Sequence, residues 1–93
     1  MTIKTSCGFE YEADIEKVLD YEFSYLIGCF QTDAPEEKIV DEKLLLDKLL
    51  GSKSEVLRFF KYIKETNDGK IESELVTDFI KESMELMKFD KKK

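Results

Sequence analysis

Apolar residues recur with helical spacing through residues 14–32. One set follows the i, i+3, i+4 pattern of a single helix face, and a second set is spaced by four. The first set is Ile15, Val18, Leu19, Phe23, Leu26, Ile27 and Phe30, and the second is Tyr21, Tyr25 and Cys29. The pattern predicts one helix, which is either central to its own domain or placed between its own core and a partner. A break near Asp20 would instead give two short helices.

Residues 2–13 alternate between apolar and polar positions, which is typical of strands. Phe9 and Tyr11 alternate with glutamates, and a shorter extended run precedes them. Residues 6–8 separate the two runs and form a plausible turn, because Gly8 is free to adopt a positive φ. We therefore expect a two-stranded β-hairpin whose apolar face rests on helices, since a lone hairpin is marginal in water.

Three more helices are expected after residue 32. Asp33, Pro35 and Glu36 form a typical helix start, with Asp33 as the cap and Glu36 completing a capping box. Gly51 is a natural stop for the same helix. The three predicted helices cover residues 35–50, 54–65 and 73–89.

The connections between these helices also carry signals. Ser52 or Ser54 is expected to cap the helix over 54–65, and Ser73 the last helix. Gly69 supplies the left-handed conformation of a turn between them. We expect one domain, 1–93, with a mainly α (α+β) fold: about four short helices packed with the N-terminal hairpin. Within it, 2–13 form the hairpin, 14–89 the helical part and 90–93 a disordered basic tail.

Composition limits the partners. The net charge is −6 and only one of the fifteen basic residues is an arginine, which argues against nucleic acid. No apolar run approaches the ~18 residues that a membrane span requires, so no membrane partner is expected. Cys7 and Cys29 lie far apart in sequence, and no signal peptide opens the chain. We expect two free thiols in a reducing cytoplasm, with one disulfide as the alternative.

Candidate chemistry is sparse. The chain has no histidine, which removes the usual general base and the commonest transition-metal ligand. Residues 64–75 partly match a calcium loop, but Lys64 and Leu75 stand where that loop needs a carboxylate and a bidentate glutamate. Neighbouring acids alternate with lysines, as on solvated helix faces. The sequence therefore predicts no enzyme, no cofactor and no metal site.

Every predicted helix has a broad apolar arc. Methionine and aromatic residues on an exposed arc make an adaptable binding surface. The candidate partner-binding residues are Tyr21, Tyr25 and Cys29 on the first helix, with Met84, Met87 and Phe89 on the last. The alternative is that four short helices in 93 residues enclose one another tightly. The residues alone leave both readings open.

The order of these elements resembles the tail assembly chaperones of long-tailed, non-contractile bacteriophages and their prophages. The resemblance rests on a strand–turn–strand at residues 5–14, an Asp-started helix, a Leu-rich helix ending in Leu-Leu-Gly at 49–51, and Asp-Gly-Lys-Ile at 68–71 before the last helix. It spans nearly the whole chain, through short motifs.

The resemblance implies a non-enzymatic role in tail assembly. Such proteins coat the long helical tape measure protein, keep it soluble, and are absent from the finished tail. Many are also made in a longer, frameshifted form that recruits the tail tube protein. The resemblance thus implies the tape measure protein as the partner and a homo-oligomer as the state of the chain. The lysines at 91–93 fit either a slippery A-rich codon run or a solubilising tail. A small cytosolic module or regulator that binds one partner helix is the alternative function.

Overall fold

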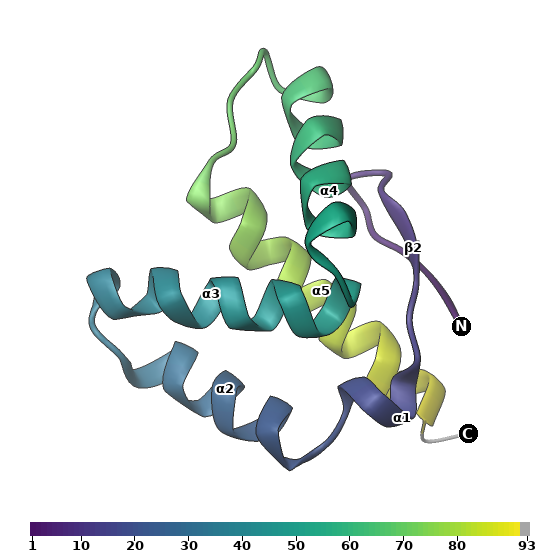
Figure 1. Cartoon of the computed structure of the whole chain (residues 1–93), viewed down its shortest axis with the longest axis vertical. Coiled ribbons are helices and arrows are strands. Elements are labelled where there is room, and N and C mark those ends of the chain that lie inside the picture. Colours follow the sequence, from purple (N-terminus) through teal and green to yellow (C-terminus); the bar gives the residue numbers. More distant parts are fainter. Residues whose placement is uncertain (92–93) are drawn as a thin grey trace.

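The computed structural model describes the backbone of residues 1–91 and the side chains of residues 1–87. In this part of the chain five helices follow a two-stranded antiparallel sheet, which confirms the mainly helical fold with an N-terminal hairpin. In Figure 1, α2 runs alongside α3, α5 crosses behind α3, and the hairpin lies beside α4. The elements are β1 Thr2–Lys4, β2 Glu10–Glu12, α1 Ile15–Val18, α2 Tyr21–Thr32, α3 Pro35–Leu50, α4 Lys53–Thr66 and α5 Ser73–Lys91.

The hairpin follows the predicted alternation. Ile3 pairs with Tyr11 across the two strands, and both side chains are buried while their strand neighbours are exposed. The turn between the strands contains Gly8 at φ 98°, and the Gly8 amide donates to the Thr5 carbonyl at 2.9 Å. The apolar face of the hairpin thus points toward the helices, as the strand period requires.

The single helix expected over residues 14–32 is wrong, because the helix is broken before Asp20. Asp20 is in an extended conformation, and its carboxylate accepts a hydrogen bond from the Phe23 amide at 2.9 Å. An aspartate caps a helix better than it extends one, so α2 restarts at this point. Asp14 stands at the N-cap of α1, but its side chain makes no capping hydrogen bond.

Helix α3 has the predicted bounds but not the predicted cap. Ala34 is its N-cap and makes no side-chain hydrogen bond, while Asp33 ends α2 instead. The expected capping box at Asp33 is therefore wrong. Gly51 ends α3 in the left-handed conformation at φ 87°, as predicted.

Helix α4 begins one residue before its predicted start, and α5 begins at the residue that was predicted to be its cap. Ser52 caps α4 and accepts from the Glu55 amide at 3.3 Å. Ser73 is the first helical residue of α5 rather than its cap, because the Val76 amide donates to the carbonyl of Glu72. Helix α5 continues to Lys91, so it includes the first two residues of the expected tail; residues 92–93 lie outside the described part.

Aromatic side chains join the hairpin to the helices. The Phe59 ring stacks on Phe79 with centroids 4.2 Å apart and meets the Phe9 ring edge-on at 5.2 Å. Tyr62 on α4 donates to the Cys7 carbonyl at 3.0 Å, and the Arg58 guanidinium covers the Phe9 ring at 4.4 Å. The hairpin is therefore fixed to α4 and α5 by stacked rings and by hydrogen bonds to its turn.

Candidate functional site

An apolar groove opens between α3, α4 and the start of α5. It encloses about 670 Å³, and we call it the α3–α4 groove. Its lining combines buried and exposed apolar side chains with a few polar ones: Ile39, Glu42, Lys43, Leu46, Asp47, Lys53, Val56, Leu57, Phe60, Ile71, Ser73 and Val76. It is a concave, mostly apolar surface contributed by three elements, as binding sites commonly are.

The floor and the rim of the groove differ in exposure. Leu46 and Val56 on the floor are buried and belong to the core. Ile39, Leu57 and Ile71 on the rim are 69%, 53% and 36% exposed. Apolar rim side chains around an apolar floor are what a partner's apolar surface would cover.

Some of the polar side chains at the groove have polar partners. The Lys43 ammonium lies 2.9 Å from the Asp47 carboxylate, and Glu42 accepts from the Thr77 hydroxyl at 3.1 Å. The lining holds two acids and two lysines in all, so it has no net charge, and the groove favours a ligand through its shape and its apolar surface.

The six candidate residues from the sequence are not brought together. Tyr21 and Tyr25 are 85% and 63% exposed on α2, and Cys29 is half-buried. Met84 and Met87 are buried in the core, so the expectation that they lie on an exposed arc is wrong. The side chain of Phe89 lies outside the described residues.

The sequence reading missed the groove itself. Its rim residues come from the middle of α3, the outer side of α4 and the connection before α5, and no motif links them. One signal was present: the apolar residues of α3 cover more than one face of the helix, so some must remain outside the core.

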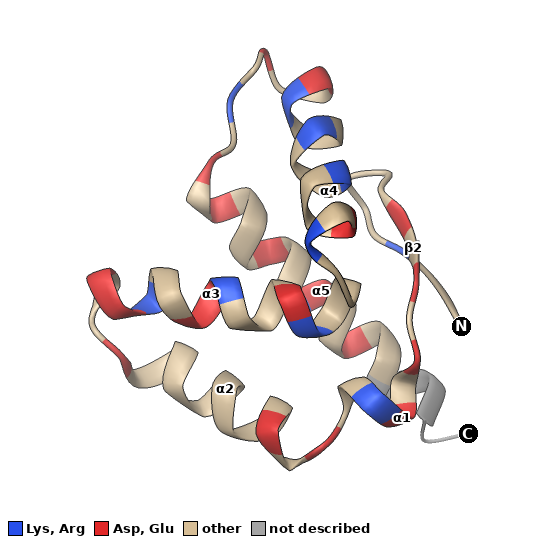
Figure 2. Ribbon diagram, viewed as in Figure 1, with Lys and Arg blue, Asp and Glu red and all other residues tan. Residues whose placement is uncertain are grey.

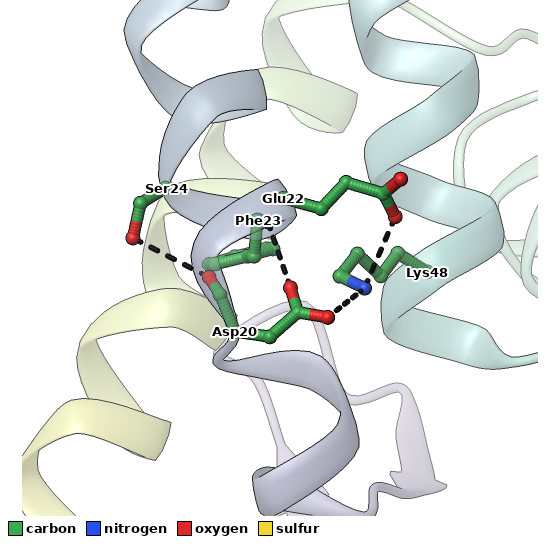
Figure 3. A network of polar contacts seen from close by, with 5 residues as sticks. All are labelled: Asp20, Glu22, Phe23, Ser24 and Lys48. Atoms are coloured by element: carbon green, nitrogen blue, oxygen red, sulfur yellow. Dashed lines mark hydrogen bonds and ion pairs between the residues drawn. The ribbon is translucent and has the colours of Figure 1, made fainter.

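A polar network ties α2 to α3 beside the helix break (Figure 3). The Lys48 ammonium lies 2.9 Å from the Asp20 carboxylate and 3.2 Å from that of Glu22. The hydrogen bond from the Phe23 amide, followed by that from Lys48, lowers the pKa of Asp20. The hydrogen bond to Asp20 is the largest cause that raises the pKa of Lys48. The cap of α2 is thereby also its link to α3.

A buried carboxyl lies near the middle of α3. Asp41 is 8% exposed, and its Oδ2 has no hydrogen-bond partner among the described residues. Desolvation raises the pKa of this carboxyl, and the neighbouring carboxyls of Asp33 and Glu37 raise it further. An acidic group that is costly to ionise thus sits where the two helices meet.

The described residues hold no group of three or more cysteine, aspartate or glutamate side chains arranged for a metal ion. Both cysteines are free thiols. No helix in this part of the chain combines the length and the apolar content needed to cross a bilayer. The α3–α4 groove remains the candidate site.

Comparison of the chain with models of known families, with curated proteins and with solved structures yields no match.

Proposed function

We propose that this protein is a non-enzymatic chaperone that binds the apolar face of a partner helix in the α3–α4 groove. In line with the resemblance in element order, the proposed partner is the tape measure protein of a long-tailed bacteriophage. The protein would act in the host cytoplasm, with several copies along one tape measure molecule. The observation that carries this proposal is the apolar groove between α3, α4 and α5.

The size of the rim sets the strength of one such contact. Full burial of a leucine or isoleucine side chain contributes about 1.5–3 kcal/mol. Ile39, Leu57 and Ile71 are between about a third and two thirds exposed, so covering them contributes together about 3 kcal/mol. A contact of this size is weak for one copy. Many copies on one long target would reinforce one another, which suits a chaperone that coats an extended helix.

The proposal is tested by co-expressing the chain with the long helical protein encoded next to it. We expect the unaltered chain to keep the long protein in the soluble fraction. The double variant Leu57→Ser with Ile71→Ser removes apolar rim surface without adding charge, so it should lose this effect while keeping the circular dichroism spectrum of the parent.

The matched control is Tyr21→Ser with Tyr25→Ser, which removes two exposed apolar side chains elsewhere. This variant should still solubilise the long protein. Loss of solubility with the tyrosine variant and not with the groove variant would reject the groove.

A regulator or interaction module that binds a single partner helix is the second candidate, because one groove lined by α3, α4 and the start of α5 can hold one helix at a time. The two functions differ in stoichiometry. Light scattering of the purified complex should give many copies for each tape measure molecule under the first proposal, and one copy for each partner under the second.

A further inference from the structure

Four exposed apolar side chains lie on the helix pair α2 and α3, outside the groove lining. We call this surface the α2–α3 face and define it by Tyr21, Tyr25, Val40 and Leu44. Their side chains are 85%, 63%, 58% and 42% exposed. In each helix the two residues are four apart, so they lie one turn from each other on the same side. None of the four lines the α3–α4 groove.

A hollow beside this face is shaped to accept a side chain. It encloses about 310 Å³ between α2 and α3, and its lining is Glu22, Leu26, Leu44, Asp47 and Lys48. Leu44 therefore belongs both to the exposed face and to the wall of this hollow. The α2–α3 face therefore has a hollow at its edge in addition to its exposed apolar side chains.

The same helix pair carries most of the net negative charge of the protein. Residues 20–48 contain eight acidic residues and three lysines, a net charge of −5 out of −6 for the whole chain. Figure 2 shows acidic positions at the two ends of α2 and acidic positions among lysines along α3, whereas α4 carries several basic ones. Apolar side chains set among uncompensated acids favour a cationic partner.

The three lysines of this segment are already engaged. Lys48 pairs with Asp20 and Glu22, Lys43 pairs with Asp47, and the Lys38 ammonium lies 5.9 Å from the centre of the Phe30 ring.

Two acidic residues near the α2–α3 face are not neutralised by these lysines. Glu36 and Glu37 are exposed one turn before Val40, and neither forms an ion pair with another described residue. At the other helix, the Cys29 side chain is the largest cause that raises the pKa of Tyr25, and the carboxylates of Asp33 and Asp41 raise it further.

We propose that the α2–α3 face binds a cationic amphipathic helix of a partner protein. Its apolar stripe would cover Tyr25, Val40 and Leu44, and its lysines or arginines would meet the acids that flank them. The tyrosine rings add to this preference, because a cation over an aromatic ring is attracted to its face.

A second copy of this chain is a poorer occupant of the face. Among the helices whose side chains the structure describes, the basic one is α4, where Lys53, Lys61 and Lys64 are exposed together with one large apolar side chain, Leu57. The other apolar residues of α4 are buried or half-buried in its own core. One leucine cannot cover four apolar side chains, and stable interfaces need a larger apolar centre.

The test uses two synthetic helical peptides with the same leucine stripe. Lysines flank the stripe in one peptide and glutamines in the other. Binding is measured by fluorescence anisotropy with the whole chain. We expect the lysine peptide to bind about tenfold more tightly. Its advantage should shrink between about 0.1 M and about 1 M salt, where the Debye length falls from about 10 Å to about 3 Å.

Two variants separate the apolar part of the face from its charge. Tyr21→Ser with Tyr25→Ser leaves the charge unchanged, so a loss of about tenfold for both peptides reports on the apolar contact. Glu36→Gln with Glu37→Gln should weaken only the lysine peptide. The control is Leu86→Ser, which removes an exposed apolar side chain of α5 outside both surfaces and should bind both peptides as the parent does. The groove variant, Leu57→Ser with Ile71→Ser, is measured alongside and should keep the advantage of the lysine peptide over the glutamine peptide.

Equal affinity for the two peptides would overturn the proposal, because the acids would then play no part. Loss of binding in the groove variant, with none in the tyrosine variant, would place the peptide in the α3–α4 groove. A dimer of the chain that the tyrosine variant abolishes would make a second copy the occupant. None of these results contradicts the proposal that the groove binds the tape measure protein, which the co-expression experiment tests separately.

Discussion

Replacing Phe59 by alanine should remove a large part of the stability of the fold. The Phe59 side chain is completely buried and its ring contacts those of Phe9 and Phe79. Truncating a buried phenylalanine costs about 3–5 kcal/mol. Because each ring pair adds about 0.5–1.5 kcal/mol beyond its buried area, we expect the upper part of that range, about 4–5 kcal/mol. A chain of 93 residues has about 5–14 kcal/mol of stability in total.

Leu57→Ala is the matched control, two residues earlier in the same helix. Leu57 is 53% exposed, so its truncation should cost less than about 1 kcal/mol. Urea and thermal unfolding followed by far-ultraviolet circular dichroism measure both variants, since the chain has no tryptophan to report on unfolding. At about 4–8 °C for each kcal/mol, Phe59→Ala should lower Tm by about 15 °C or more.

Similar losses for the two variants would refute this reasoning. They would mean that α4 does not turn Phe59 toward the hairpin and Leu57 toward the groove. The groove rim would then be placed wrongly as well, because both assignments depend on the same rotation of α4 about its axis.

Two further predictions concern a buried carboxyl and two glycines. Burial and the carboxyl of Asp33 raise the pKa of Asp41, so the folded protein binds the proton of this carboxyl more tightly than the unfolded chain does. The stability that results is present at low pH and is lost as pH rises through the raised pKa. Asp41→Asn should therefore raise Tm at neutral pH and lose this advantage in acid, and an unchanged gap across a pH series would contradict the shift. At Gly8, with φ 98°, a Cβ would overlap the Tyr62 hydroxyl, so Gly8→Ala should destabilise by more than about 1 kcal/mol. Gly28 has open space around it within α2, so Gly28→Ala should stabilise the protein by about 0.5–1 kcal/mol. Equal changes in Tm for Gly8→Ala and Gly28→Ala would contradict the turn geometry at Gly8.

Local signals in the sequence determined most of the elements. The alternation around Tyr11 predicted a strand with one buried face, and Gly51 predicted where α3 ends, because both depend on residues close in sequence. The break at Asp20 was harder to predict, since apolar residues on both sides keep the helical period. It is stabilised by the capping bond to Phe23 and by Lys48, twenty-eight positions away.

The candidate surfaces were decided by the tertiary structure. The sequence marked an excess of apolar helix surface, but a periodic pattern cannot say which part of that excess another element covers. Packing placed Met84 and Met87 inside and left Tyr21 and Tyr25 outside. It also made the α3–α4 groove from three elements whose side chains meet only after the helices pack. Local chemistry fixes where a helix begins and ends, whereas burial depends on neighbours that are distant in sequence.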